Sequence, residues 1–391
     1  MMHKLRNSYI PEIRAVLFGR KTPDTVSVNL TNRCNLSCIY CEIGKNLTPR
    51  EGSLLSFEDM TWVISEMSQL GMKRLAMCGG EPFLFPGLVQ LVDMANQMKV
   101  RCTITSNGMS ICKLDPESLG ILKRCQTRIN ISLDSYDEKT NTVTRGHPAA
   151  LSNALESIKV LREEGIPFTI LSVISKHNFT RLHELVMEAQ KSGAPEVLFQ
   201  PVIFASNYPG TEKLADKGRL NVEVGDAGVL LQQLDMILRF EKTHRIKTNA
   251  YRLKYWIEPY LSHAHQGNGG FFFNDVLGRF YCREVDAIIE ISCDGNIQAC
   301  GLIGSDVNVR ENREEGLLKL WKKANENLRD DLIKKQYRAE CNACCNHFGR
   351  NMIASILRYP LANRRMAIKM GKLLISRGLH ESNKKIKANW T

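Results

Sequence analysis

Three cysteines stand close together near the start of the chain. Cys34, Cys38 and Cys41 have the spacing CxxxCxxC within the segment CNLSCIYC. Three thiolates on one short loop can ligate three irons of a [4Fe–4S] cluster, whose ligands are normally cysteines, and the fourth iron then stays open to a substrate. The alternatives are a zinc site or incidental cysteines. A structural zinc site normally has four protein ligands, and no nearby His or Cys completes this set.

A second set of cysteines lies towards the end of the chain. Cys282 and Cys300 are separated by 17 residues, and Cys341 and Cys344 form a CxxC pair. On spacing alone these four residues suit zinc and an iron–sulfur cluster equally well. Three further residues either replace one of these ligands or do not bind the metal at all: Cys293, Cys345 and His347.

The other cysteines of the 13 in the chain call for a different interpretation. The N-terminal segment has neither the apolar run nor the small-residue cleavage site of a secretory signal, so a cytoplasmic location is expected. Disulfides are rare in that reducing compartment. We therefore expect the four cysteines between the two sets to be buried as small apolar side chains: Cys78, Cys102, Cys112 and Cys125.

The first 200 residues alternate between short β-branched segments and helical patterns. The expected strands are Val26–Leu30, Arg74–Cys78, Cys102–Thr105, Arg128–Leu133, Phe168–Ile174 and Glu196–Val202. The expected helices are Phe57–Leu70, Leu88–Met98, Pro116–Lys123, Ala149–Glu164 and Arg181–Lys191. This alternation is typical of a parallel sheet with right-handed crossovers. About six such units predict an α/β fold, a partial (β/α)6 TIM-type barrel.

Polar motifs follow the expected strands in one consistent place. The cysteine loop follows the first strand, Gly79-Gly80-Glu81-Pro82 the second and Ser106-Asn107-Gly108 the third, while Ser132 and Asp134 lie at the end of the fourth. In parallel α/β barrels the loops at the carboxyl ends of the strands build the active site. We therefore expect these motifs to meet on one rim. Ordinary turn chemistry is the alternative for the Ser, Asn and Asp residues.

After the first 200 residues the regular alternation of predicted strands and helices ends. Residues 203–281 are less regular, with one helical pattern near Gly228–Phe240. Ile288–Ile291, a turn at Asp294-Gly295-Asn296 and Ile297–Ala299 then predict a β-hairpin, and a helix is expected around Leu317–Leu328. The second cysteine set thus lies in a small C-terminal domain made of a hairpin and a helix.

In their order and context these motifs resemble those of the radical S-adenosylmethionine (SAM) superfamily. CNLSCIYC follows one strand of a partial barrel and GGEP follows the next. The resemblance implies an oxidoreductase whose [4Fe–4S] cluster is held by Cys34, Cys38 and Cys41, with SAM chelating the open iron. It further implies that an electron from a flavodoxin- or ferredoxin-type donor cleaves SAM, and that the resulting 5′-deoxyadenosyl radical abstracts a hydrogen atom from the substrate.

The resemblance also assigns contacts with SAM. Tyr40 occupies the position of an aromatic residue beside the adenine. Gly79, Gly80, Glu81 and Pro82 correspond to the segment that contacts the methionyl amine, where glycines permit close approach and a carboxylate suits an ammonium group. The remaining residues are placed to bond the ribose or the carboxylate of SAM: Ser106, Asn107, Ser132, Asp134 and Arg145.

After the barrel, the pattern C…DGNIQAC…GLLKLW…CNAC resembles the SPASM/twitch extensions, which carry auxiliary [4Fe–4S] clusters. No cysteine follows Cys345, whereas the full two-cluster SPASM pattern continues further. The resemblance therefore favours the single-cluster twitch arrangement, with Cys282, Cys300, Cys341 and Cys344 as ligands. Such a cluster implies an electron that leaves or enters the substrate, which favours oxidation, radical-induced bond formation or epimerisation. Of these, a dehydrogenase or an epimerase is the preferred type. Structural zinc is the alternative.

The net charge of +12 is concentrated at the end of the chain, where residues 351–391 contain nine Lys or Arg and one acid. Met366, Met370, Leu373 and Leu374 have helical spacing, so we expect a basic amphipathic helix that ends near Gly378. Packing of its apolar stripe on the protein is the preferred interpretation. The alternative is contact with an anionic membrane, a phosphorylated substrate or an acidic partner. No nucleic-acid partner is expected, because the rest of the chain is only mildly basic.

These features divide the chain into an N-terminal extension (1–24), a barrel (25–203), a connecting or capping segment (204–281), an auxiliary-cluster domain (282–350) and a basic tail (351–391). Residues 1–24 are too short for a separate peptide-recognition domain, which favours a small polyol, cyclitol or sugar as substrate, nucleotide-linked sugars included. Modification of a peptide or protein is the second hypothesis. The third is a noncatalytic iron–sulfur or zinc protein, which would not need the GGEP segment for a SAM amine.

Overall fold

The computed structural model describes residues 22–41, 54–202, 220–254, 281–282, 284–301, 303–334 and 355–364, together with residues 336, 338 and 368. Six parallel strands follow one another in the chain: β1 (Thr25–Thr31), β2 (Arg74–Gly79), β3 (Arg101–Ser106), β4 (Arg128–Ser132), β5 (Phe168–Ile174) and β6 (Glu196–Pro201). Three shorter strands join the same sheet: β7 (Lys247–Thr248), β8 (Ile288–Ile291) and β9 (Ile297–Gln298). The strand order β7-β6-β5-β4-β3-β2-β1-β8-β9 is that of an open barrel.

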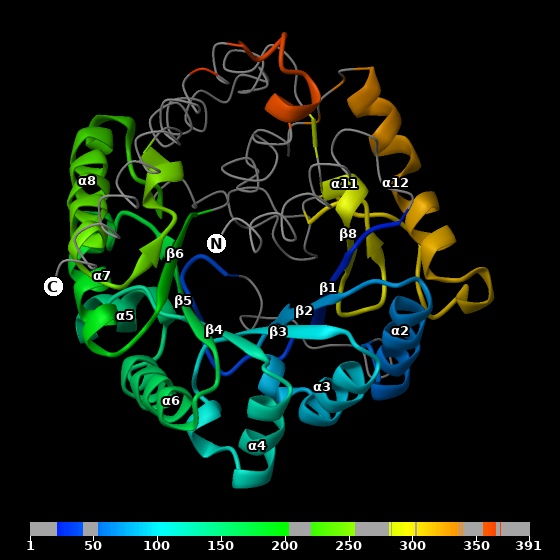
Figure 1. Ribbon diagram of the computed structural model, residues 1–391, viewed down its shortest axis with the longest axis horizontal. Coiled ribbons are helices and arrows are strands. Elements are labelled where there is room, and N and C mark those ends of the chain that lie inside the picture. Colours follow the sequence, from blue (N-terminus) through cyan, green and yellow to red (C-terminus); the bar gives the residue numbers. More distant parts are fainter. Residues whose placement is uncertain are drawn as a thin grey trace, which may run out of the picture.

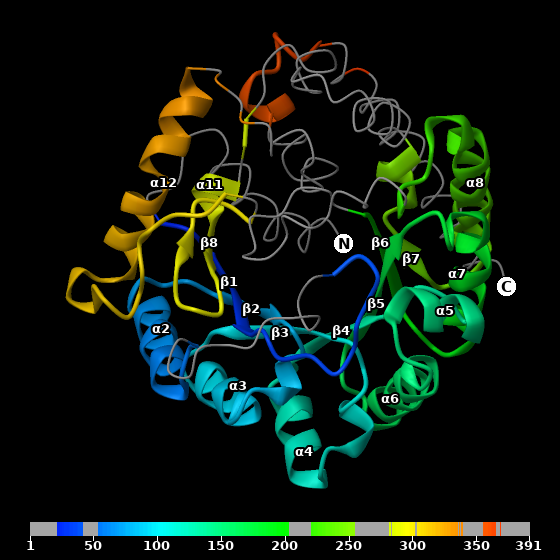
Figure 2. The same cartoon turned by 180° about the vertical axis from the view of Figure 1, so that it is seen from behind.

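Helices cover the outer face of this curved sheet, as Figures 1 and 2 show from opposite ends. Those of the barrel are α2 (Phe57–Gln69), α3 (Leu88–Gln97), α4 (Pro116–Arg124), α5 (Glu138–Arg145), α6 (Ala150–Glu164), α7 (Leu182–Lys191) and α8 (Ala227–Thr243). Local signals set their ends. Ser56 and Asp59 form a capping box at the start of α2, and Gly165 ends α6 in the left-handed conformation.

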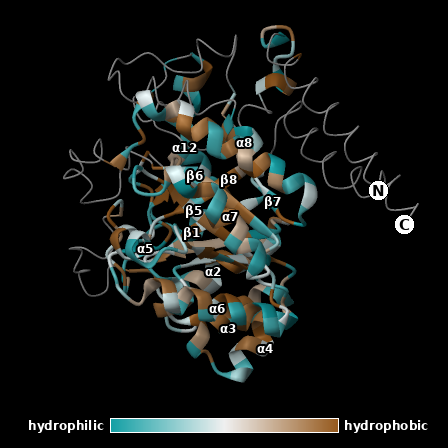
Figure 3. Ribbon diagram, turned by 90° about the vertical axis from the view of Figure 1, so that its left-hand side faces the viewer, coloured by the Kyte–Doolittle hydropathy of each residue, from teal (hydrophilic) through white to brown (hydrophobic). Residues whose placement is uncertain are grey.

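The main core lies between the sheet and its helices. Val26, Val28 and Leu30 of β1 have no exposed surface, whereas Ser27 and Asn29, which alternate with them, face the barrel interior. Figure 3 shows hydrophobic residues concentrated on the central strands and interspersed with hydrophilic ones along the surrounding helices. Burial of one such aliphatic side chain is worth roughly 1.5–3 kcal/mol. The apolar face therefore fixes the orientation of each strand and leaves the polar face towards the interior.

The partial barrel predicted from the sequence is confirmed. Each of the six expected strands and five expected helices is present, and no end differs by more than one residue. The helix expected near Gly228–Phe240 is α8. The sequence analysis did not anticipate α5 or the two-residue β7. Asp137, which caps the start of α5, and Gly146, which ends it, are the local signals that could have identified α5.

The predicted C-terminal hairpin and helix are also present, but the hairpin continues the barrel sheet. β8 pairs in parallel with β1, with Glu290 opposite Ser27, and β9 pairs with β8 in the antiparallel direction. The short helix α11 (Glu284–Ala287) precedes β8, and α12 (Leu317–Ile333) packs outside the hairpin. Trp321 of α12 donates its indole N–H to the carbonyl of Ile288 at 3.0 Å.

Contacts with α2 tie this C-terminal segment to the barrel. The Glu66 carboxylate accepts a hydrogen bond from the backbone N–H of Leu317 at 2.8 Å, and Arg313 forms an ion pair with the buried carboxylate of Asp59. No helix within the described ranges is long and apolar enough to cross a bilayer. Several expectations lie outside the described residues, namely those for Cys341, Cys344, Cys345, His347 and the amphipathic helix of the tail.

Candidate functional site

The loop that carries the first three cysteines starts at the end of β1 and is bound on two sides. On one side the backbone N–H of Glu81, just after β2, donates to the carbonyl of Arg33 at 2.8 Å. On the other side the N–H of Ile39 donates to the carbonyl of Thr144 in α5 at 3.1 Å. Cys34 and Cys38 also pack on a small apolar cluster made by Leu36, Met109 and Ala150. The loop is therefore fixed at the carboxyl-terminal rim of the barrel.

Two glycines make this close approach possible. A Cβ atom at Gly80 would overlap the carbonyl oxygen of Arg33, and one at Gly146 would overlap that of Ser37. Gly146 also has a φ of +67°, which disfavours any side chain. The sequence analysis assigned Gly79 and Gly80 to close contact with SAM. The structure shows that Gly80 admits the cysteine loop itself, while its contact with SAM stays a prediction.

Glu81 is fully buried and links the ends of β2 and β3. Its carboxylate accepts hydrogen bonds from the Ser106 hydroxyl (2.8 Å), the Asn107 backbone N–H (2.8 Å) and the Phe83 backbone N–H (3.1 Å). Burial raises the pKa of Glu81, and these three donors oppose the shift. The structure therefore brings together Glu81, Ser106 and Asn107, all three of which were predicted to contact SAM. In the structure they hydrogen-bond one another directly.

Asn107 extends this network to the cysteine loop. Its side-chain amide donates to the side-chain oxygen of Asn35 at 2.7 Å and lies 3.8 Å from the sulfur of Cys34. Cys34 lies immediately before Asn35, so the end of β3 positions the first cysteine of the motif. The predicted role of Pro82 is less direct, because this buried residue starts the short 3-10 helix Pro82–Leu84 behind Glu81.

A buried ion pair lies on the opposite side of the loop. The Arg145 guanidinium, with a side chain 7% exposed, contacts the fully buried carboxylate of Asp134 at 2.8 Å. The Tyr40 hydroxyl donates to the other oxygen of this carboxylate at 2.5 Å, and the Val173 backbone N–H donates to the first at 2.8 Å. The guanidinium also lies over the Tyr40 ring, 5.6 Å from its centroid. The three predicted SAM contacts Tyr40, Asp134 and Arg145 thus form one unit.

Two thiols of the loop hold their protons more tightly than a free cysteine does. Burial raises the pKa of Cys34 and that of Cys38, although the neighbouring Arg145 acts in the opposite direction on Cys38. Burial raises the pKa of Tyr40 as well. Cysteine binds iron as the thiolate, so cluster assembly must release these protons.

The residues of this rim fit an iron–sulfur cluster and SAM. All three cysteines are partly exposed and lie on one loop. No three His, Cys, Asp or Glu side chains in the described ranges converge on a single metal ion, but a four-iron cluster takes each cysteine on a different iron. Arg145 Nε is a buried donor without a partner in the part of the chain that the structure describes. A buried donor normally has an acceptor, and the SAM carboxylate would supply one.

Below this rim, the barrel interior contains a cavity of about 720 Å³. Tyr40, Ser132 and Arg145 line it near the cysteine loop, and Thr25 and Arg74 line it at the opposite, amino-terminal end of the strands. A volume of about 300–1,000 Å³ is typical of small-molecule sites. The cavity therefore has room for a substrate beside the predicted SAM contacts.

Charged side chains lie on two walls of the cavity, from the opposite edges of the open sheet. Arg252, which follows β7, hydrogen-bonds the Tyr251 hydroxyl at 2.8 Å and has no acidic partner among the described residues. Glu284 and Glu290 belong to α11 and β8. The sequence analysis did not single out these three residues. The alternation of Ile289, Glu290 and Ile291 is a signal that could have placed Glu290 towards the interior.

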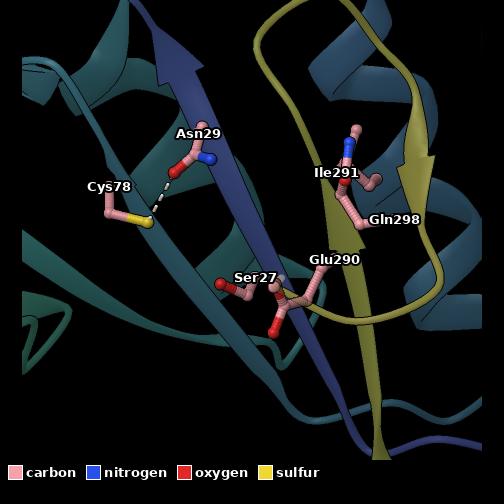
Figure 4. Close-up of a pocket in the computed structure, with 7 residues that line it drawn as sticks. Ser27, Asn29, Cys78, Glu290, Ile291 and Gln298 are labelled. Atoms are coloured by element: carbon pink, nitrogen blue, oxygen red, sulfur yellow. Dashed lines mark hydrogen bonds between the residues drawn. The ribbon is translucent and has the colours of Figure 1, made fainter. Parts of the chain in front are cut away.

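A small polar recess opens beside Glu290. It measures about 50 Å³ and is lined by Ser27, Asn29, Cys78, Glu290, Ile291, Gln298 and Gly301. Figure 4 shows Glu290 extending from β8 towards Ser27 of β1, with Cys78 bonded to Asn29. Burial and the nearby Glu284 carboxylate raise the pKa of Glu290 to about 7, against the effect of a hydrogen bond from the Gly301 backbone. The recess is polar and large enough to hold water.

The structure describes two of the four predicted auxiliary ligands and brings them together. Cys282 and Cys300 pack against the same small apolar cluster. Burial, with the Glu284 carboxylate nearby, raises the pKa of Cys282 well above its usual value. Cys293 lies in the turn between β8 and β9, where its carbonyl accepts a hydrogen bond from Leu55.

The expectation that four cysteines are buried is only half correct. Cys102 and Cys125 are 6% and 8% exposed, as predicted, but Cys78 and Cys112 are partly exposed. Cys78 lies on the interior face of β2 and borders the polar recess, which explains the difference. Cys112 lies beside the Asn153 side chain at 3.7 Å instead of in the core.

Comparison with known proteins gives three further findings. Residues 28–189 match the family model of the Radical SAM superfamily. Among curated proteins, the chain is 34% identical over 165 residues to a GTP 3′,8-cyclase of Petrotoga mobilis, covering 41% of this chain and 49% of that protein. It is 29% identical over 178 residues to a PqqA peptide cyclase of Gluconobacter oxydans, covering 45% and 48%. The matches thus span about half the length of these two relatives.

Among solved structures, SuiB of Streptococcus suis bound to the precursor peptide SuiA superposes with a TM-score of 0.60 at 18% identity. The superposition covers 88% of this chain and 75% of SuiB. At this identity the likeness concerns the fold alone.

Proposed function

Residues 28–189 make this chain a member of the radical SAM superfamily, and from that premise we propose that it is an enzyme that cleaves SAM reductively to act on a substrate in the barrel cavity. The cofactors of this family are a [4Fe–4S] cluster and SAM. We assign the cluster to Cys34, Cys38 and Cys41, and SAM to the rim formed by Tyr40, Glu81 and Arg145 with the other predicted contacts. A flavodoxin- or ferredoxin-type protein is the proposed electron donor.

One observation supports this proposal most strongly. The CxxxCxxC loop is held between the segment after β2 and the end of α5, directly above a cavity whose upper wall contains Tyr40, Ser132 and Arg145. A noncatalytic iron–sulfur protein has no need of a cavity of about 720 Å³ beside its cluster loop.

When bound, the cluster and SAM would supply a 5′-deoxyadenosyl radical, which abstracts a hydrogen atom from the substrate. The chain itself has to position the reacting carbon and exclude other hydrogen donors. Arg145 Nε is the buried donor proposed to orient the SAM carboxylate. The interior walls of β1 to β6 and β8 would enclose the substrate beneath it.

We propose a small polar substrate as the first candidate, a polyol, cyclitol or sugar that is oxidised or epimerised. Arg252 favours a member of this class that carries an anionic group, such as a nucleotide-linked sugar, because its guanidinium faces the cavity and has no acidic partner among the described residues.

A peptide is the second candidate. The observation in its favour is the similarity to a PqqA peptide cyclase, whose matched region includes 45% of this chain. The C-terminal carboxylate of such a peptide is also an anion that Arg252 can bind.

We further propose that Cys282 and Cys300, with Cys341 and Cys344, hold an auxiliary [4Fe–4S] cluster. The packing of the first two cysteines against one small apolar cluster supports this assignment, and structural zinc is the competing one. Anaerobically isolated protein should then contain about eight irons per chain and almost no zinc. A Cys282→Ala, Cys300→Ala double variant should contain about four. One tightly bound zinc per chain with four irons would refute the auxiliary cluster and leave the barrel site intact.

The substrate class is tested by the rate of 5′-deoxyadenosine formation in the presence of uridine diphosphate sugars or of synthetic peptides. The true class should increase this rate, and Arg252→Gln should raise its KM by about 10- to 150-fold, the loss expected for a charge-assisted hydrogen bond. Arg181→Gln, at an exposed position outside the cavity, is the matched control. Stimulation that is unaffected by Arg252→Gln would contradict the assignment of an anionic group to this wall.

A further inference from the structure

The buried ion pair beneath the cysteine loop lies beside a predicted cluster ligand. Arg145 donates to the Asp134 carboxylate at 2.8 Å, and its neighbours Thr144 and Gly146 lie against Ile39 and Ser37, on either side of Cys38. Both charged side chains are almost completely buried, at 7% and 0% exposure. Cys38 is the central cysteine of the motif, so one guanidinium lies near both a predicted metal ligand and a carboxylate of the barrel wall.

Further hydrogen bonds fix the Asp134 side of this ion pair. Asp134 also accepts hydrogen bonds from the Tyr40 hydroxyl and from the Val173 backbone N–H. The backbone N–H of Asp134 faces the Asn141 side chain at 3.4 Å, and its carbonyl accepts from Asn178 at 3.0 Å. The carboxylate therefore has fixed donors from several elements, and we expect it to stay in place when Arg145 is substituted.

We propose that Arg145 and Asp134 act as an opposed pair of charges that sets the reduction potential of the cluster held by Cys34, Cys38 and Cys41. This inference rests on the proposed function, because it assumes that a cluster is bound there. Arg145 favours the reduced cluster, which carries one more negative charge, and Asp134 opposes it. Both are positioning residues, since they act through Cys38 and its sulfur.

General physical chemistry supports both of these effects on the reduction potential. Net charge and hydrogen bonds to the cysteine sulfurs are among the factors that determine the potential of an iron–sulfur cluster. Charges in a buried site interact much more strongly than charges in water, because little solvent screens them. Removal of one partner of a buried pair also leaves the other charge uncompensated. The two single substitutions should therefore shift the potential in opposite directions.

The test is an EPR-monitored redox titration of the reconstituted protein without SAM. Arg145→Gln should lower the midpoint potential relative to the wild type, and Asp134→Asn should raise it. Arg145→Lys, which keeps the charge, should give a smaller shift than Arg145→Gln. Arg181→Gln removes an equivalent charge from an exposed position and should leave the potential unchanged.

The possible outcomes distinguish a failure of the proposed function from a failure of the charge-pair inference. If the wild type assembles no cluster at these cysteines, the proposed function fails. If the cluster assembles and both variants shift its potential in the same direction, or not at all, only the opposed-charge inference is overturned. Should Arg145→Gln fail to fold, the rise in Asp134→Asn decides, because that substitution is isosteric and keeps an acceptor for the Val173 N–H.

Discussion

At the scale of single residues, the site contains buried polar groups whose partners come from distant parts of the sequence. Glu81, Asp134 and Arg145 are separated by many residues, yet each is bonded within one rim. The sequence identified Glu81 and Asp134 as polar residues at strand ends, because that position follows from the α/β alternation. Arg145 was expected at this site only from the family resemblance, and it lies in the last turn of α5. The sequence did not predict that Arg145 bonds Asp134, since such a pairing depends on the curvature of the sheet and on α5.

Glu81→Gln tests the dual role of this carboxylate. A glutamine has one acceptor oxygen in place of two, so one of the three donors that now bond Glu81 would face an NH2 group. We expect a loss of about 1–3 kcal/mol in the free energy of unfolding. If the carboxylate also holds the methionyl ammonium, SAM affinity should fall by about 10- to 150-fold, with unchanged iron content. Normal SAM affinity in a destabilised variant would show that Glu81 is a structural residue only.

Glu290→Gln is expected to change the dependence of stability on pH. The folded-state pKa of about 7 lies above the ordinary glutamate value of 4.5, so Glu290 binds a proton more tightly in the folded state. Its contribution is fully favourable below about pH 4.5 and is lost as the pH rises through 7. Above pH 8 the variant should therefore be more stable than the wild type by up to about 3 kcal/mol.

Thermal unfolding between pH 6 and pH 8.5 measures this effect, and the advantage of the variant should grow with pH. Glu163→Gln, at an exposed position, is the control and should show a constant difference. A constant difference for Glu290→Gln as well would mean that this carboxyl has an ordinary pKa.

At the scale of the elements, strands and helices were predictable to within a residue through most of the barrel. Strong local signals explain this success, such as the capping box of Ser56 and Asp59 and the left-handed Gly165. The exceptions are α5, which carries mostly polar residues, and the two-residue β7. β8 was recognised as a strand, but its parallel pairing with β1 joins segments more than 250 residues apart, and no local pattern encodes it.

Gly146→Ala tests how the cysteine loop is attached to α5. A Cβ at this position would overlap the carbonyl of Ser37 and so displace the loop. We expect the purified variant to retain clearly less iron than the wild type. Gly165→Ala is a closely matched control, since it ends α6 with a φ of +70° but has open space around its Cβ. Both variants incur the conformational cost of a left-handed alanine, roughly 1 kcal/mol. Equal iron retention in the two would contradict the close contact.

At the scale of the whole molecule, the predicted auxiliary-cluster domain is attached to the barrel by a shared sheet. β8 extends the sheet beyond β1, and α12 bonds to α2 through Leu317 and Glu66. This arrangement places Cys282 and Cys300 near the edge of the barrel, with the charged wall of Glu284 and Glu290 next to them. A substrate in the cavity would then lie between the two cysteine sets.

Hydrogen exchange measured by mass spectrometry checks this continuity. Because β8 is hydrogen-bonded to β1, peptides that cover residues 288–291 should be protected about as strongly as those that cover 25–31. Exchange of β8 that is much faster than that of β1 would indicate a separately unfolding domain.

The central claim is that Cys34, Cys38 and Cys41 hold a cluster that cleaves SAM. The most direct test is the formation of 5′-deoxyadenosine after anaerobic incubation of the reconstituted protein with SAM and dithionite, measured by chromatography. The wild type and Cys112→Ala, whose cysteine lies outside both sets, should release this product, and Cys34→Ala, Cys38→Ala and Cys41→Ala should release none. The claim would be contradicted if these three variants formed 5′-deoxyadenosine at the wild-type rate. It would also be contradicted if the iron-loaded wild type formed none.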